Sequence, residues 1–180
     1  MAMAMKRKPD PDAGAAALAT PTDLKPRDVE KVAAALNGLL ADAYVLYLKT
    51  KNFHWHVSGP NFRDIHVMLD EQAADILGST DELAERVRKL GARTLRSLAE
   101  ALELTGLKEN NEDFVPPHDM LIELMEDNKA VAAAMRKAHK VCDEAGDIAS
   151  ASLIENYVDQ TEKRTWFLFE MSRAAGPHGH

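Results

Sequence analysis

The sequence has little of what secreted, membrane-spanning and nucleic-acid-coating proteins need. Its only cysteine, Cys142, has no disulfide partner within the chain, so a reducing, cytosolic setting fits best. No apolar run approaches the roughly 18 residues of a membrane-spanning helix, and the basic start has no apolar core behind it that would make a secretory signal. Positive charge is also short, since 22 Lys and Arg stand against 29 Asp and Glu, a net of −7. A nucleic-acid binder that works through its whole folded surface is therefore disfavoured.

Sustained β-type alternation is missing as well, and helical periodicity fills the chain instead. Apolar residues recur at helical spacing from Pro26 to about residue 57, and a proline suits the first position of a helix. The same pattern predicts long helices over about 61–90, 118–144 and 147–173, with a short helix within 94–103. Gly91 and Gly146 are natural residues to end the second and third long helices, and Asp147 can cap the last one.

These helices predict an all-α fold with one folded domain. Two helical hairpins with short turns are joined by a crossover of roughly 25 residues that carries the short helix, which is a four-helix bundle with its long connection between helices two and three. The bundle covers 26–173. Residues 1–25, rich in proline and alanine, are predicted to form a flexible N-terminal tail, and residues 174–180 a loose C-terminal tail.

Four metal-ligating side chains fall on one face of the second long helix. At about 100° per residue, His66, Asp70, Asp81 and Glu85 lie at about 0°, 40°, 60° and 100° around the helix. His54 closes the preceding helix and lies just across the turn from His66. Imidazole and carboxylate groups together are the ligands that iron, manganese and zinc sites use.

Each pair of these residues, taken alone, has an ordinary alternative explanation. A His–Asp or Asp–Glu pair four residues apart is most often part of a solvated helix face. His56 points to the other side of its helix from His54 and is interpreted as a structural or surface residue. Trp55 is interpreted first as a residue that packs in the core or in an interface.

The spacing along the helix favours a metal site shared between two subunits. Asp70 and Asp81 are about 16 Å apart along the axis, too far to bind one small metal centre within a chain. In an antiparallel copy related by a two-fold axis near residues 75 and 76, Glu85 would meet His66 and Asp81 would meet Asp70, because the two pairs of positions have the same sum. Small residues lie near that axis and would let the helices approach closely: Ala73, Ala74 and Gly78.

A di-metal site inside a single bundle is the alternative design. Such sites use a Glu-x-x-His motif on each of two helices. The sequence has no Glu-x-x-His spacing. A site between subunits is therefore favoured over a site within the bundle.

The segment KNFHWHVSGPNFRDIHVMLDE, followed by DELAERVRKLG, resembles the Dps proteins, the mini-ferritins known as DNA-binding proteins from starved cells. The resemblance covers roughly residues 26–173. It implies a ferritin-like bundle and a hollow, acidic shell of twelve identical subunits. It also implies that Fe(II) is oxidised at sites between two-fold-related subunits, with hydrogen peroxide as the preferred oxidant, and stored as ferric oxyhydroxide.

The ligands of this family carry over onto matching positions. Its histidine before tryptophan falls on His54, its second histidine and following aspartate fall on His66 and Asp70, and its later pair falls on Asp81 and Glu85. The resemblance thus implies a ferroxidase with two irons per inter-subunit site, where Glu85 can bridge the irons. Trp55, beside the site, would be a quencher of stray radicals, with packing as its alternative role.

The sequence departs from the family at three places. Gly91-Ala92 stands where two glycines are common. Ala151-Ser152 stands where an aspartate usually lines the pore through which iron enters, so we expect that pore instead at Asp143, Glu144 and Asp147, whose alternative role is to cap the last helix. The lysine-rich tail of strong DNA binders is reduced to Lys6, Arg7 and Lys8, so weak DNA binding through these residues is expected.

Two other functions remain open. One is a nucleoid-compacting protein that binds DNA and has little iron chemistry. The other is a catalytically silent helical oligomer that holds zinc or no metal. For all three the sequence predicts a cytoplasmic protein, with nucleoid association if DNA is bound, and no membrane partner.

Overall fold

The computed structural model describes residues 11–173, and within that range all regular secondary structure is helical, with no strand. The helices are α1 (Pro11–Leu18), α2 (Pro26–His56), α3 (Phe62–Lys89), α4 (Leu98–Leu104), α5 (Pro117–Glu144) and α6 (Ile148–Ser172). Lys6, Arg7 and Lys8 and the segment 174–180 lie outside the described residues.

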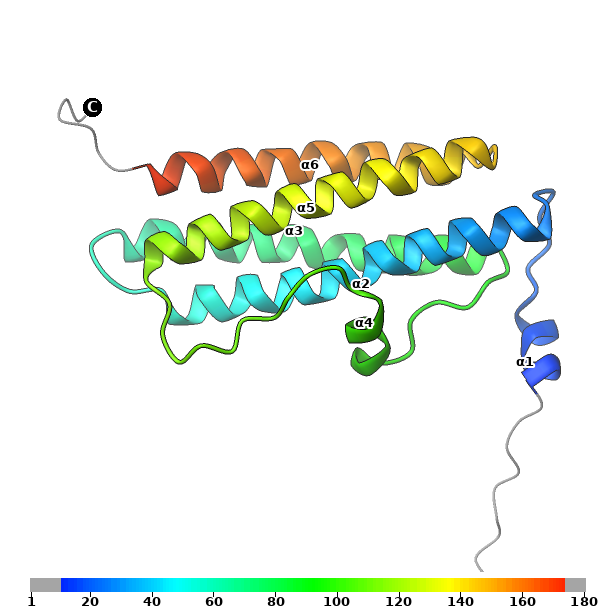
Figure 1. The fold of residues 1–180 in the computed structure, drawn as a ribbon, viewed down its shortest axis with the longest axis horizontal. Helices are drawn as coiled ribbons and strands as arrows, with labels where there is room; N and C mark the ends of the chain where they lie inside the picture. Colours follow the sequence, from blue (N-terminus) through cyan, green and yellow to red (C-terminus); the bar gives the residue numbers. More distant parts are fainter. Residues whose placement is uncertain (1–10, 174–180) are drawn as a thin grey trace, which may run out of the picture.

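Four long helices form the bundle that the sequence predicts. The hairpin α2–α3 packs against the hairpin α5–α6, mainly through α2 and α5, and the crossover with α4 runs along the outer side of α2 (Figure 1). Side-chain contacts also tie α3 to the other hairpin: Tyr157 of α6 donates a hydrogen bond to Glu82, and Arg86 is ion-paired with Asp147 and donates to Ser150. The all-α class, the long crossover and its short helix are thus confirmed.

Helix α2 is the central helix of the bundle. Leu36, Leu40 and Leu46 on it are at most 1% exposed. By length and composition α2 is also apolar enough to cross a membrane, although no uninterrupted apolar run predicts this. However, 56% of its most apolar window is buried inside the molecule, which is the pattern of a core helix.

The helix ends follow the punctuation of the sequence. Pro26 opens α2, and Gly91 and Gly146 adopt positive φ angles of 80° and 72° after α3 and α5. The side chain of Asp147 accepts a hydrogen bond from the amide of Ser150, which caps α6 as predicted. These ends place His54 in the last turn of α2 and His66 in the second turn of α3.

The described part of the N-terminal segment is more ordered than the sequence predicts. A flexible tail is expected over 1–25, whereas residues 11–18 form α1 and the chain after it is bonded to the end of α3. The physical reasons are the high helix propensity of the alanine run and the tertiary contacts that follow it. In this part of the segment, the low-complexity sequence therefore forms a short docked helix rather than a flexible tail.

A buried polar network anchors the crossover to α2. Asp42 accepts hydrogen bonds from the hydroxyl of Thr105 and the amide of Gly106, at 2.8 and 2.7 Å. Burial raises the pKa of Asp42, and these bonds offset part of that rise. Lys49, 4% exposed, is ion-paired with Glu123 and Asp127 of α5, so its charge is compensated inside the bundle.

Candidate metal centre

The two histidines meet across the turn between α2 and α3. Their rings stack with centroids 3.8 Å apart and an interplanar angle of 20°. Nδ1 of His54 lies 2.8 Å from the carbonyl oxygen of His66, and Nδ1 of His66 lies 2.9 Å from that of His54. This reciprocal pair of bonds fixes both rings and holds the helix ends together.

These bonds also define which nitrogen of each ring is available to a metal. A carbonyl oxygen only accepts hydrogen bonds, so each Nδ1 must carry a proton. In the neutral imidazole the lone pair is then on Nε2. Backbone carbonyls commonly orient metal-binding histidines in this way. His54 and His66 are therefore arranged as two Nε2 donors.

Asp70 lies next to this histidine pair, one turn after His66. One of its oxygens, Oδ1, is 3.8 Å from Nε2 of His54 and 2.7 Å from Nζ of Lys51. The hydrogen bond from Lys51 is the largest of the effects that hold the pKa of Asp70 below its usual value. The carboxylate is thus ionised at neutral pH and already holds a cation, the Lys51 ammonium.

Asp81 and Glu85 lie on exposed turns near the other end of α3. Glu85 accepts an exposed ion pair from Lys89 at 3.2 Å. In the described chain no three His, Cys, Asp or Glu side chains are grouped so that they could hold a metal ion together. The structure thus places Asp70 beside the pair His54 and His66, short of a complete set of metal ligands, and it leaves Asp81 and Glu85 apart from them.

The outer face of α3 between Asp70 and Asp81 is predicted to carry three small residues, Ala73, Ala74 and Gly78, and the structure confirms this only in part. Ala74 and Gly78 are exposed there, and nothing lies within 4 Å of the position where a Cβ on Gly78 would be. Ala73, however, is 1% exposed and belongs to the core. Its inclusion in this face is corrected: at about 100° per residue it lies about 100° from Ala74 around the helix, which turns it inward.

The donor chemistry of the bundle interior differs from that of a di-metal site. Between α5 and α6, buried Arg164 donates to Asn128 at 3.0 Å and to Thr161 at 2.7 Å. Burial lowers the pKa of Arg164 to about 10, and its guanidinium is still charged at neutral pH. This fixed cation repels a second one, so the histidine pair beside the turn between α2 and α3 remains the candidate centre.

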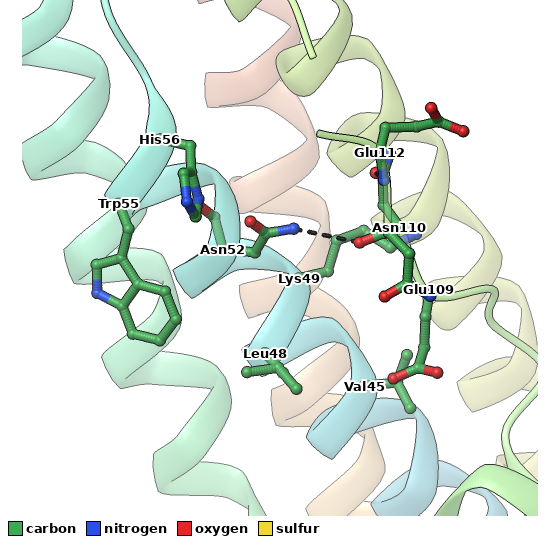
Figure 2. Close-up of a pocket in the computed structure, with 10 residues that line it drawn as sticks. Val45, Leu48, Lys49, Asn52, Trp55, His56, Glu109, Asn110 and Glu112 are labelled. Atoms are coloured by element: carbon green, nitrogen blue, oxygen red, sulfur yellow. Dashed lines mark hydrogen bonds between the residues drawn. The ribbon is translucent and has the colours of Figure 1, made fainter. Parts of the chain in front are cut away.

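Trp55 is not packed in the core of the chain. Its side chain is 59% exposed, and Nζ of Lys51 lies 5.8 Å from its ring centroid. It borders a groove of about 340 Å³ between α2 and the crossover, where Asn52 donates to the carbonyl of Asn110 (Figure 2). Packing against another subunit or contact with the site are the two roles this position allows.

The predicted pore residues separate into two kinds. Asp143 and Glu144 are exposed at the end of α5. Asp147 is 3% exposed and is held by Arg86 at 2.6 Å and by Ser150. Its side chain faces α3 and caps α6, so the structure gives it the capping role that was the alternative to pore lining.

Lys51 is the residue of this site that the sequence analysis did not single out. It lies three residues before His54 and four before Trp55, on the same side of α2. This spacing could have indicated Lys51, because a lysine one helical turn before a metal-binding histidine can reach a carboxylate that lies beside that histidine. The partner itself, Asp70, is on another helix and is visible only in the fold.

Comparison with known proteins agrees with this architecture. A model of the ferritin-like domain family matches residues 33–173. A DNA protection during starvation protein of Brevibacillus brevis is 35% identical over 137 residues, which cover 76% of this chain and 91% of that protein. The Dps structure from Thermosynechococcus elongatus superposes with a TM-score of 0.81 at 28% identity, covering 86% of this chain and 98% of the other.

A third match bears on metal chemistry. The Dps structure from Vibrio cholerae O1 has a TM-score of 0.80 and 29% identity, covering 86% of this chain and 98% of the other. It is described as a member of a broad superfamily of ferritin-like diiron-carboxylate proteins. The fold and the histidine–carboxylate pair together define a ferritin-like four-helix-bundle protein. Within that class, the chain belongs to the Dps family.

Proposed function

We propose that this protein is a mini-ferritin that oxidises Fe(II), preferably with hydrogen peroxide, at sites shared between two-fold-related subunits of a twelve-subunit shell that stores the ferric product. One observation carries the proposal. His54 and His66 are fixed as Nε2 donors beside ionised Asp70, whereas Asp81 and Glu85 lie too far along the same helix to join them within one chain.

Each ligand has a distinct task in this proposal. His54 and His66 set the geometry, since their rings are locked by the reciprocal carbonyl bonds. Asp70 and the Glu85 of a neighbouring copy supply negative charge, and Asp81 binds directly or through a water. Hard oxygen ligands with neutral imidazoles suit iron and allow it to leave after oxidation.

The reaction is balanced by two irons per site. Two Fe(II) give up one electron each, and one hydrogen peroxide with two protons becomes two waters. Because the peroxide receives both electrons at one site, it is not reduced by one electron to hydroxyl radical. The proposed role of exposed Trp55 is to take up an occasional stray radical near the site, as an alternative to packing.

Mixed shells test the shared site directly. One variant carries His66→Ala and Asp70→Ala, and the other carries Asp81→Ala and Glu85→Ala. Alone, each should assemble and lose rapid Fe(II) oxidation. When the variants are unfolded and reassembled in equal amounts, half of the two-fold interfaces pair unlike subunits, and each of these regains one of its two sites. About one quarter of the wild-type rate should therefore return.

The controls separate assembly from chemistry. Glu71→Ala, on an exposed position of α3 outside the ligand set, should keep the full rate. The particle mass of every shell is measured alongside. If mixed shells of normal mass remain inactive, the shared-site proposal is wrong. If the wild-type protein itself consumes no peroxide with Fe(II), the protein is a silent oligomer or a DNA-compacting protein instead.

DNA binding is the second candidate function, favoured by the name of the Brevibacillus relative, a DNA protection during starvation protein. We propose that DNA is a weak partner, contacted by Lys6, Arg7 and Lys8, and that protection comes mainly from removing Fe(II) and peroxide. A cytoplasmic location, with the nucleoid reached only through this weak contact, follows from the same proposal.

A further inference from the structure

The end of α1 and the segment that follows it are bonded to the end of α3 in both directions. The guanidinium of Arg88 donates through Nη2 to the carbonyl of Leu18 at 2.9 Å. The hydroxyl of Thr20 donates to the carbonyl of Arg88 at 3.0 Å. Arg88 therefore both gives and receives a bond, and residues 11–25 lie on the bundle as a strap.

Gly91 is the residue of the bundle that makes room for this strap. Its φ of 80° ends α3, and a Cβ at this position would lie 2.8 Å from the carbonyl oxygen and 3.0 Å from the amide nitrogen of Thr20. Both atoms belong to backbone, which cannot rotate away as a flexible side chain can. A side chain at 91 would thus have to push the strap off the end of α3.

Gly146 offers the matched comparison. Its φ of 72° is nearly the same as that of Gly91, but nothing lies within 4 Å of the position of its Cβ. Alanine at either glycine therefore imposes a similar backbone strain. Only alanine at 91 adds the collision with the strap.

The packing of the strap against the bundle is not continuous. A hollow of about 760 Å³ is lined by the strap, by the start of α2 and by residues 90–93. Loss of one contact should therefore weaken docking measurably. The contacts around Thr20 and Gly91 are the ones to remove.

Docking of the strap changes the point at which the basic N-terminal residues are attached to the folded body. With the strap docked, Lys6 is at most five residues, or about 18 Å of extended chain, from Pro11, whereas after release it is twenty residues, or about 70 Å, from Pro26. The effective concentration of a tethered group falls roughly as the −3/2 power of tether length, which is about eightfold for this change.

We propose that residues 11–25 are a docking strap, accepted by Gly91, that roots the DNA-contacting segment Lys6–Lys8 at the end of α3. The docking itself depends only on the contacts described above. The consequence for DNA rests on the proposed DNA contact of the preceding section. The experiment therefore measures docking and DNA binding separately.

Docking is measured by hydrogen exchange of the assembled, full-length protein without DNA. In Gly91→Ala, amides of residues 12–20 should exchange about tenfold faster than in the wild type, the factor expected for one lost hydrogen-bond-sized interaction. In Gly146→Ala they should exchange at the wild-type rate. Equal exchange of this segment in both variants would overturn the strap.

A second pair of variants keeps the test valid if Gly91→Ala does not fold. Thr20→Val removes the hydroxyl that reaches Arg88, and Thr22→Val removes a hydroxyl that accepts a local bond from the amide of Leu24. Faster exchange in Thr20→Val than in Thr22→Val supports docking. The same exchange in both overturns it.

DNA binding is then measured by gel shift at low salt on the same proteins. Release of the strap should weaken binding up to about eightfold in Gly91→Ala and leave it unchanged in Gly146→Ala. If the strap is released and binding does not change, although deletion of residues 1–8 abolishes it, the rooting role is wrong. If deletion of residues 1–8 has no effect on binding, the proposed DNA contact fails, while the exchange result decides the docking of the strap independently.

Discussion

Lys51 and Asp70 form an ion pair across the seam between α2 and α3, with Nζ and Oδ1 2.7 Å apart. The same carboxylate oxygen lies 3.8 Å from Nε2 of His54, the nitrogen that we assign to metal binding. A metal ion that uses His54 and Asp70 together must therefore compete with the ammonium. In the proposed iron site, the Lys51 ammonium would therefore act as a built-in competitor of the metal.

Lys51→Met is expected to tighten binding of redox-silent Co(II), by roughly two- to fivefold as for an exposed ion pair. It should also make binding more sensitive to acid. Lys51 holds the pKa of Asp70 low, so in the variant that pKa returns upward and protons compete with the metal at a higher pH. Calorimetric titrations at pH 7 and pH 5 measure both effects.

Lys129→Met is the matched control, because Lys129 is ion-paired with Glu126 on α5, outside the site. It should leave Co(II) binding unchanged at both pH values. Unchanged or weaker Co(II) binding in Lys51→Met would mean that the ammonium does not compete with the metal. The stability of the fold in acid should hardly change. A carboxylate whose pKa is lowered in the folded state stabilises the fold only at pH values above that pKa, and this contribution is small for Asp70 because its side chain is exposed.

Asp147→Ala should be far more destabilising than Asp143→Ala. It leaves Arg86 without its ion-pair partner and removes the cap of α6, and the loss of one member of a buried pair costs about 3–5 kcal/mol. Asp143→Ala, on an exposed turn of the same connection, should change the free energy of unfolding by less than about 0.5 kcal/mol. Urea denaturation of both variants makes the comparison, and equal stabilities would contradict the structural role.

The helices and the two halves of the site could be predicted because they depend on local signals. Pro26, Gly91 and Gly146 mark helix ends, and His66 and Asp70 share a face by spacing alone. Ala73 is next to Ala74 in the sequence, yet it is buried in the core whereas Ala74 is exposed. The predicted face is therefore wrong at this one position. A face of four ligands fixes the side of a helix only to within about a quarter turn.

The contacts that the sequence did not predict are those between distant segments. The partner of Asp147 is Arg86, 61 residues away, and no local pattern indicates the pair. The strap is similar: its composition indicates a tail, and its contacts with the end of α3, among them those of Thr20 with Arg88 and Gly91, make it part of the fold. Low complexity predicts that a segment lacks its own core, not that it has nowhere to dock.

Asp143→Asn with Glu144→Gln tests the proposed path of iron into the shell. Rings of carboxylates concentrate cations, so neutralising them should slow Fe(II) uptake about tenfold at low ionic strength, with a smaller effect as salt rises. The melting temperature should hardly change, because both side chains are exposed. Stopped-flow uptake at several salt concentrations provides the measurement.

The control for iron uptake removes the same charge elsewhere. Glu103→Gln with Asp113→Asn neutralises two exposed carboxylates of the crossover region and should leave uptake at the wild-type rate. If both double variants slow uptake equally, the overall charge of the shell matters rather than a pore at the end of α5. If neither does, iron enters elsewhere.

DNA binding should appear at low salt and fade near physiological ionic strength. Residues 1–25 carry +1 of the total charge of −7, so the rest of each chain carries −8 and repels a phosphate backbone. Only the first eight residues, at +3, attract it, and each neutralised phosphate contributes about −0.9 to the slope of log K against log salt. Deletion of residues 1–8 should abolish binding, whereas Lys6→Arg, Arg7→Lys and Lys8→Arg together should preserve it. Gel shifts across a salt series decide between these outcomes, and tight binding by the deletion variant at physiological salt would place the DNA contact on the folded body.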